Sequence, residues 1–303
     1  MEGIMNDNFK VDFFGISPPR CATTWMYKNL KKHPEICMSS KGETCYFGKW
    51  KYEKGLDFYA GFFDYCEPNQ IKGDSTPTYF SQEGVAERIK RHNPEAKFYV
   101  CLRHPIERTW SHYLHQRSQG LRAALFDFDE AMEEMWDYYI KPSKYYTCLK
   151  EYLDRFPREN ILILTFDDLK DDPLDFLQSI FEFLEVSPEF EPEGFDKKVN
   201  PFKKREIKHG RLLRWGWKVE NFLRVRQDKS LVGPLYKFLK KGGAGAWRKV
   251  REDFLKGSAK QKEGKKPALD EDKIQELKEI FNPEIEKVEQ LIDKDLSSWK
   301  NYE

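Results

Sequence analysis

Three short runs of apolar residues predict buried β-strands. They are Phe9 to Ile16, Ala96 to Leu102 and Asn160 to Phe166, and each ends at polar or turn-forming residues. Continuous apolar runs of this length are typical of strands that are covered on both faces. Each run is followed along the chain by a segment with a different periodicity, which changes the prediction from strand to helix.

Apolar residues at the spacing of amphipathic helices occupy the segments between and after these runs. The predicted helices cover Thr23 to His33, Arg108 to Gln119, Tyr145 to Phe156, Leu174 to Leu184 and Asp272 to Trp299. Strands that alternate with helices indicate an α/β fold with a parallel sheet flanked by helices. Because ligands of such sheets bind beyond the carboxyl ends of the strands, we expect the loops at 17–24 and 103–111 to share one site.

Composition adds limits to this picture. The chain has 303 residues, of which 39% are hydrophobic and 15% aromatic, which is enough for one large core or two smaller ones. The formal net charge of +1 gives no overall attraction to nucleic acid or membranes. We find no apolar stretch of transmembrane length and no signal-peptide pattern at the polar N-terminus, so we expect a cytoplasmic protein.

The six cysteines show neither CxxC pairs nor the spacing of metal ligands. We therefore expect reduced thiols and no metal site. Charge is unevenly distributed, since Lys and Arg outnumber Asp and Glu by 23 to 6 between residues 197 and 266. A solvated helical surface is the usual explanation for such a bias, and an anion-binding surface is the alternative.

The loop after the first strand has the properties of a phosphate site. It reads Ser17-Pro18-Pro19-Arg20-Cys21-Ala22-Thr23-Thr24 and leads into a helix, for which Thr23 or Thr24 is a plausible N-cap. A helix start presents backbone N–H groups to an anion, and Arg20 adds a permanent charge. The GxxxxGK[ST] motif that binds magnesium nucleotides is missing. An ordinary capped helix with a surface arginine remains an alternative at this point.

A second candidate anion site follows the strand at Ala96 to Leu102. Arg103 comes directly after the strand, and Ser111 lies eight positions later on the predicted helix. An arginine and a hydroxyl would suit a second phosphate, although an arginine that merely covers the strand end explains the pattern as well.

Both loops resemble motifs of the sulfotransferases that use 3'-phosphoadenosine 5'-phosphosulfate (PAPS). The segment Gly15 to Met26 is similar to their 5'-phosphosulfate loop, with Ala22 where glycine is usual. The segment Cys101 to Tyr113 is similar to their 3'-phosphate motif, in which Arg103, Pro105, Arg108, Ser111 and Tyr113 match. The resemblance implies a P-loop-like three-layer fold in which PAPS, or its product 3'-phosphoadenosine 5'-phosphate (PAP), is bound without a metal ion. The implied cofactor-binding residues are Arg20, Cys21, Ala22, Thr23, Thr24, Trp25, Arg103 and Ser111.

The resemblance also implies a general base. The segment Ser40 to Phe47 is similar to the K-E-x-x-F-F segment of glycan-type and bacterial members, so that Glu43 is the expected base. Lys41, which Gly42 displaces from the usual adjacent position, and Arg20 are the other implied catalytic residues. The segment Lys72 to Phe80 resembles a segment that lines the acceptor side of the cleft. It offers four substrate contacts, Asp74, Ser75, Thr76 and Tyr79.

The resemblance covers most of the chain, so we expect a single sulfotransferase domain over residues 1–303, with the basic helical region 197–303 packed on it. Either Lys240 to Arg248 or Gly257 to Pro267 would cover the nucleotide. The expected reaction is transfer of a sulfuryl group from PAPS to a hydroxyl or amine of a glycan or small-molecule acceptor, with no nucleic-acid partner. The alternatives are an ATP-dependent small-molecule kinase and a non-catalytic polyanion-binding protein.

Overall fold

The structure is a computed structural model that describes residues 9–119, 126–196, 204–205, 261–262 and 267–302. Two compact units divide the chain. The first comprises residues 1–109, 140–200 and 269–303, and the second comprises residues 110–139 and 201–268. The segment 198–200 and most of the basic region, including both candidate nucleotide-covering loops up to residue 266 apart from 261–262, lie outside the described residues.

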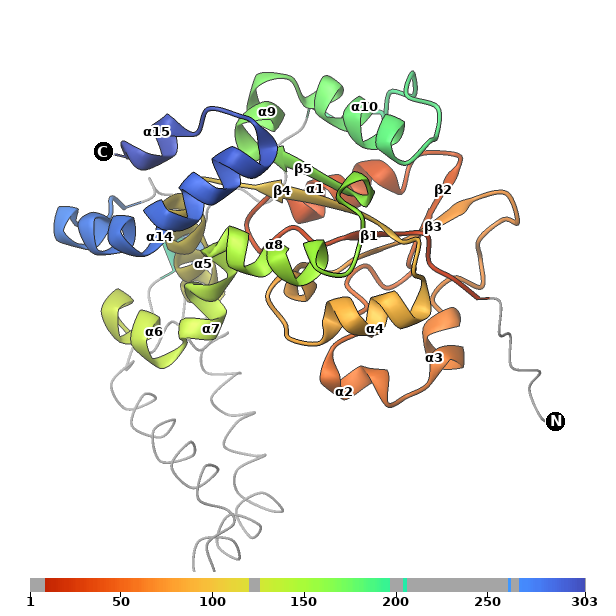
Figure 1. Ribbon diagram of the computed structural model, residues 1–303, viewed down its shortest axis with the longest axis horizontal. Helices are drawn as coiled ribbons and strands as arrows, with labels where there is room; N and C mark the ends of the chain where they lie inside the picture. The colour runs from red at the N-terminus through yellow and green to blue at the C-terminus, as the bar shows by residue number, and fades with distance from the viewer. Residues whose placement is uncertain (1–8, 120–125, 197–203, 206–260, 263–266, 303) are drawn as a thin grey trace, which may run out of the picture. The chain divides into compact units, whose positions relative to one another are not determined.

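A five-stranded parallel sheet forms the centre of the first unit, with the strand order β2-β3-β1-β4-β5 (Figure 1). The strands are β1 (Phe13–Gly15), β2 (Ile36–Met38), β3 (Ile71–Ser75), β4 (Lys97–Leu102) and β5 (Ile161–Thr165). The three predicted strands are confirmed as β1, β4 and β5, and the predicted parallel sheet is confirmed. Strands β2 and β3 were not predicted.

The helices of the first unit lie against both faces of this sheet (Figure 1). They are α1 (Thr23–Leu30), α2 (Lys49–Tyr52), α3 (Leu56–Ala60), α4 (Val85–His92), α8 (Tyr145–Leu153), α9 (Phe166–Asp171), α10 (Pro173–Phe183), α14 (Glu271–Ile292) and α15 (Ser297–Lys300), with short 3-10 turns at Pro77–Phe80, Lys141–Ser143 and Arg158–Asn160. Helix α5 (Pro105–Ser118) begins in this unit and continues into the second. The second unit also holds α6 (Phe128–Glu134), α7 (Trp136–Tyr139) and the antiparallel pair β6 (Lys204–Arg205) and β7 (Gln261–Lys262).

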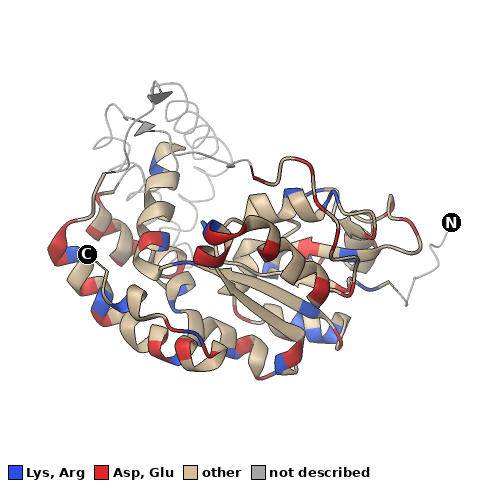
Figure 2. Cartoon of the chain, turned by 90° about the horizontal axis from the view of Figure 1, so that it is seen from above, with Lys and Arg blue, Asp and Glu red and all other residues tan. Residues whose placement is uncertain are grey.

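Alternate residues of the strands supply the two halves of the core, as the pleat of a strand requires. Phe13 and Tyr99 pack with residues of α1 and α10 on one face. On the other face, Phe14 stacks on Phe98, whose ring also contacts Tyr152 of α8. Charged residues lie mainly on helices and loops, and few occur in the strands (Figure 2). This pattern explains why β4 and β5 read as continuous apolar runs.

The cysteines differ from the prediction. Cys37 of β2 and Cys66, which precedes β3, form a disulfide, whereas Cys21, Cys45, Cys101 and Cys148 are free. The expectation that all six are reduced thiols is therefore wrong for one pair, because the sheet brings together two residues that lie 29 positions apart. Within the described residues no group of three or more acidic, histidine or cysteine side chains could hold a metal ion. In the same part of the chain, no helix combines the length and the hydropathy needed to cross a bilayer.

Candidate active site

The two predicted anion loops leave the sheet at the same edge. Strands β1 and β4 are hydrogen-bonded neighbours, with Gly15 opposite Tyr99. Beyond the strand end, the backbone N–H of Ile16 donates to the carbonyl of Tyr99 over 3.1 Å, and Ser17 Oγ accepts from the N–H of Cys101 over 2.8 Å. The first loop is thus tied to β4 immediately before Arg20, as the sequence predicted from the parallel topology.

The first loop has an unusual backbone. Arg20 has φ 77° and Ala22 has φ 56°, so both residues occupy the left-handed region that favours glycine. The N-cap of α1 is Ala22, and it makes no side-chain capping bond. The prediction of a Thr23 or Thr24 cap is therefore wrong, because the left-handed turn moves the helix start forward so that both threonines lie inside the first turn.

Arg20 and Arg103 are electrostatically coupled. Partial burial lowers the pKa of Arg20, and the positive charge of Arg103 lowers it further. The charge of Arg103 thus lies close enough to disfavour that of Arg20, and two such cations suit an anionic ligand, whose binding would relieve the repulsion. The side chains of Cys21 and Trp25 face the interior instead. Burial raises the pKa of the Cys21 thiol to about 11, and Trp25 Nε1 donates to the carbonyl of Phe195 over 2.7 Å. In these two residues, the backbone is therefore the part available to a nucleotide.

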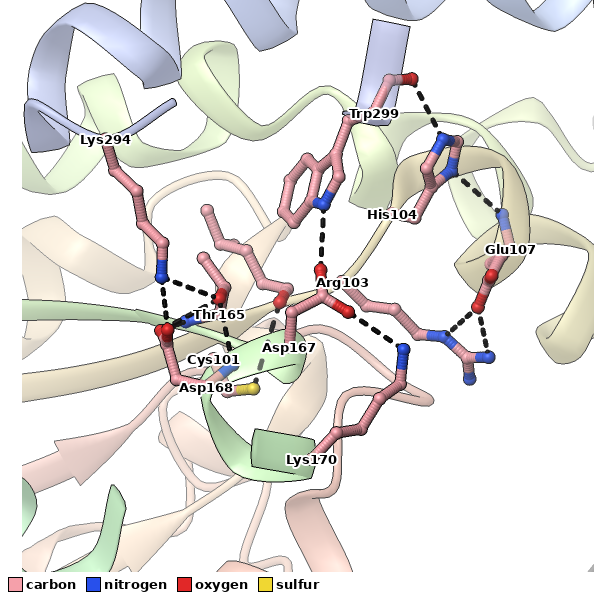
Figure 3. Close-up of polar contacts among 11 residues, drawn as sticks. Cys101, Arg103, His104, Glu107, Thr165, Asp167, Asp168, Lys170, Lys294 and Trp299 are labelled. Carbon is pink, nitrogen blue, oxygen red and sulfur yellow. Dashed lines mark hydrogen bonds and ion pairs between the residues drawn. The ribbon is translucent and has the colours of Figure 1, made fainter. Parts of the chain in front are cut away.

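Arg103 is held in place by its neighbours at the end of β4 (Figure 3). Its Nε and one terminal nitrogen donate to the same carboxylate oxygen of Glu107 over 3.0 and 2.6 Å. The guanidinium also lies 4.8 Å from the ring centre of Phe166. These contacts fix the orientation of the guanidinium before any ligand arrives. Figure 3 also shows the C-terminal segment at this edge, where Trp299 Nε1 donates to Asp167 over 3.0 Å.

Arg108 connects the two loops. It is fully buried on α5 and donates to Ser143 Oγ over 2.5 Å and to Thr109 Oγ1 over 3.2 Å. A terminal nitrogen also lies 3.5 Å from the carbonyl oxygen of Pro19, which directly precedes Arg20. The sequence identified Arg108 only as a motif match. Its burial was the missing information, since arginine is rarely buried unless its donors are satisfied.

Ser111 lies on α5, in the part of the helix that belongs to the second unit. Its predicted contact with a 3'-phosphate stays a prediction.

His104, the histidine of the same motif, is buried, and its Nε2 lies 2.9 Å from the carbonyl oxygen of Trp299. Burial lowers the pKa of His104 to about 4, so this side chain is neutral at physiological pH and holds the C-terminal segment.

Glu43 lies in the segment that connects β2 to β3. Its carboxylate is accessible to solvent, yet the surrounding protein removes part of its hydration and raises its pKa, and the negative charge of Asp74 adds to this shift. A carboxylate with a raised pKa is a stronger base than an ordinary glutamate.

Lys41 is exposed, and its Nζ lies 5.6 Å from the ring centre of Phe62. Among the described residues, no contact of Lys41 supports its predicted catalytic role, which stays a prediction.

The four predicted substrate contacts are buried. Asp74, Thr76 and Tyr79 are 0% exposed and Ser75 is 4% exposed. The hydroxyls of Thr76 and Tyr79 donate to the Asp74 carboxylate over 2.8 and 3.1 Å. The polar atoms of these three residues thus bond within the protein, beneath the Glu43 segment.

Comparisons with known proteins identify the family of this chain. A model of the family described as "Sulfotransferase domain" matches residues 10–292. The human bifunctional heparan sulfate N-deacetylase/N-sulfotransferase 2 is 29% identical over 196 residues, which are 58% of this chain and 22% of the relative. The corresponding Drosophila melanogaster protein is 27% identical over 205 residues, 58% of this chain and 20% of the relative. The chain therefore spans about a fifth of the length of these curated relatives.

The fold also has a solved counterpart. The crystal structure of a sulfotransferase from Alicyclobacillus acidocaldarius superposes with a TM-score of 0.65 at 20% identity, covering 97% of this chain and 100% of that one. At this level of identity the likeness concerns the fold, and it confirms the expected α/β architecture.

Proposed function

The chain belongs to the sulfotransferase domain family, and we propose that it transfers a sulfuryl group from PAPS to an acceptor hydroxyl or amine. The observation that carries this proposal is the shared edge of β1 and β4. There two partly buried guanidinium groups, from Arg20 and Arg103, are close enough for the charge of one to lower the pKa of the other. Two cations at one edge fit a nucleotide that carries phosphate at both its 3' and 5' positions.

The residues of the first loop would hold the 5' end of this donor, which supplies an activated sulfuryl group bonded to a phosphate oxygen. Arg20 and the backbone N–H groups at the start of α1 would stabilise the negative charge that develops on that oxygen as its bond to sulfur breaks. Arg103, oriented by Glu107, would hold the 3'-phosphate, and Ser111 would assist it. Neither a metal ion nor a covalent intermediate is needed for this displacement.

Glu43 would act as the general base. Its accessible carboxylate would accept the proton of the acceptor hydroxyl or amine while the new bond to sulfur forms. The raised pKa of Glu43 favours this role, since a base works best when its pKa lies nearer the working pH.

The acceptor class follows from the relatives only as a proposal. The printed names of the matched relatives describe N-sulfotransferases of heparan sulfate. We therefore propose a glycan that carries free amino groups as the first acceptor to examine, and a small-molecule alcohol as the second. The family match over residues 10–292 supports one sulfotransferase domain that includes both compact units.

The compartment is also a proposal. The sequence predicted a cytoplasmic protein, whereas the Cys37–Cys66 disulfide is typical of proteins that fold in an oxidising compartment. We infer that the protein is oxidised at this pair where it acts. Counting free thiols in the denatured, unreduced protein isolated from its source would give four if this is correct and six if the pair is reduced.

A melting-temperature comparison tests the proposed function directly. PAP should raise the melting temperature of the full chain, and ATP with magnesium should raise it much less. An equal or larger shift with ATP and magnesium would favour a kinase instead. Incubation with [35S]PAPS and completely de-N-sulfated heparin, with a set of simple alcohols in parallel, then tests transfer. Failure of PAP to bind would refute the proposal.

A further inference from the structure

A buried carboxylate lies beneath the segment that carries Glu43. Asp74, the fourth residue of β3, is 0% exposed and accepts hydrogen bonds from four hydroxyl groups. Thr44 and Tyr59 donate to it over 2.6 and 3.0 Å, and Thr76 and Tyr79 donate over 2.8 and 3.1 Å. Such a set of donors satisfies the carboxylate oxygens, whose burial without hydrogen bonds would cost a large free energy.

Three of these hydroxyls also accept from the backbone, and the donors are consecutive. The N–H of Cys45 donates to Thr76 Oγ1 over 3.3 Å, that of Tyr46 to Thr44 Oγ1 over 3.1 Å, and that of Phe47 to the Tyr79 hydroxyl over 3.1 Å. The Thr44 and Tyr79 hydroxyls also lie 3.0 Å from each other. Each hydroxyl has one proton, and its contact with Asp74 directs that proton toward the carboxylate, so that the oxygen presents a lone pair to the backbone. The carboxylate thereby sets the direction of all three hydroxyl groups.

The backbone of the segment is shaped accordingly. Cys45 has φ 51°, a left-handed conformation that is unfavourable for a residue with a side chain. The neighbouring hydrogen bonds hold it there, and they leave Glu43, two residues earlier, at the solvent-accessible surface. The conformation of the Glu43 segment therefore depends on contacts with β3 and the turn after it.

We propose that Asp74 is a positioning residue for the candidate base: through Thr44, Thr76 and Tyr79 it fixes the three consecutive backbone N–H groups of residues 45–47, which begin two positions after Glu43. This role differs from that of an acceptor contact, which the sequence predicted for Asp74 and which stays a prediction. The inference rests on the proposed function only for the role of Glu43 as the base. The geometric part stands without it.

Charge supports the same assignment. The negative charge of Asp74 contributes to the raised pKa of Glu43. The Cys45 thiol interacts electrostatically with Glu43 and with Lys51, which donates to the carbonyl of Thr44. Tyr59 and Tyr79 have pKa values raised well above the ordinary value by burial and by Asp74, so they stay protonated donors. Removing the charge of Asp74 should therefore lower the pKa of Glu43.

Hydrogen–deuterium exchange of the full chain tests the geometry without any acceptor. In Asp74→Asn the side-chain amide cannot accept from all the hydroxyls, so the amides of residues 45–47 should exchange at least about tenfold faster than in the parent protein. Tyr59→Phe is the matched control. It also removes a donor to Asp74, but one whose oxygen accepts from none of the three backbone N–H groups, so exchange there should change by less than about twofold. Should Asp74→Asn fail to fold, Thr44→Val removes the acceptor of the Tyr46 N–H together with one of the four donors to Asp74, and it should accelerate exchange in the same peptide.

A pH profile distinguishes positioning of the base from mere support of the fold. The rate of transfer from [35S]PAPS to de-N-sulfated heparin is measured as a function of pH. The acidic side of this pH–rate profile should move to lower pH in Asp74→Asn and stay in place in Tyr59→Phe. If the parent protein does not sulfate this acceptor, the proposed acceptor class fails, and the Glu43 carboxyl is titrated instead by 13C NMR, assigned with Glu43→Gln. Unchanged exchange at residues 45–47 in both Asp74→Asn and Thr44→Val, or an unchanged Glu43 titration in Asp74→Asn, would overturn the proposal.

Discussion

Replacing Arg108 with methionine should weaken both the fold and nucleotide binding, because this side chain joins the two anion loops. Its guanidinium is fully buried and donates to Ser143 and Thr109, and it also reaches the carbonyl of Pro19. Methionine has a similar length and fills the space, so Arg108→Met removes the donors without opening a large cavity.

The magnitude follows from the partners left behind. Ser143 Oγ keeps contacts with Thr109 Oγ1 at 2.9 Å and the carbonyl of Pro105 at 3.2 Å, so it is not left unsatisfied. The free energy of unfolding falls by about 1.5–3 kcal/mol through loss of the short bond to Ser143, which is a hydrogen bond from a charged group. Loss of the contact with the Pro19 carbonyl lowers it by about 1 kcal/mol more. Relief from burying a charge offsets part of this sum. We expect a net loss of about 1.5–3 kcal/mol, which lowers the melting temperature by roughly 3–10 °C.

Differential scanning calorimetry of Arg108→Met and of Arg91→Met, an exposed arginine paired with Glu87, provides the comparison. The control should change stability by less than about 0.5 kcal/mol. Isothermal titration with PAP should give a Kd about tenfold higher for Arg108→Met, the equivalent of about 1.4 kcal/mol of lost preorganisation. Equal melting temperatures and equal PAP affinities in the two variants would show that Arg108 does not connect the two loops.

Three further outcomes are expected. Glu43→Ala should abolish sulfuryl transfer and leave the Kd for PAP within about twofold. In the parent protein, the rate of transfer should fall as the pH drops through the raised pKa of Glu43, because protonation removes the base at a higher pH than in an ordinary glutamate. Arg20→Ala should lower transfer by at least about a hundredfold and weaken PAP binding, as a calorimetric titration would show, and wild-type turnover in this variant would exclude the assigned role. Cys37→Ser should lower the free energy of unfolding by about 3 kcal/mol, since it opens a cross-link between residues 29 positions apart. An identical loss of stability when a reductant is added to the parent protein would confirm that the missing disulfide causes the effect.

The sequence predicted those parts of the fold in which local pattern and tertiary environment agree. Strands β4 and β5 are continuous apolar runs, and both were found close to their true bounds. Strand β3 was missed because it reads Ile-Lys-Gly-Asp-Ser, with two charged residues and a glycine. Gly73 is required there by packing rather than by a turn, since a Cβ atom at this position would lie 2.1 Å from Phe13 Cζ of the neighbouring strand. Such a requirement is visible only once the strands are paired.

For the candidate site, the sequence predicted that the two loops lie at one edge of the sheet, and β1 and β4 are neighbours there. The roles of the individual loop residues stay predictions. The sequence could not show that Ala22 adopts a left-handed conformation, because alanine rarely does so. It also could not distinguish Asp74 from a surface carboxylate, since the deciding partner, Tyr59, comes from a helix 15 residues earlier in the chain.

The two carboxylates of the site illustrate how one fold gives the same chemical group different roles. Asp74 and Glu43 both have raised pKa values, and loss of hydration is the largest cause in each. Four hydroxyl donors oppose this effect at Asp74 and favour its ionised form, whereas the described contacts give Glu43 no such donors and leave it accessible to an acceptor. A carboxylate whose lone pairs are occupied is a poor proton acceptor, and one that lies beside a fixed negative charge is a better one. Asp74 therefore suits a role in positioning, and its charge in turn makes Glu43 the better base.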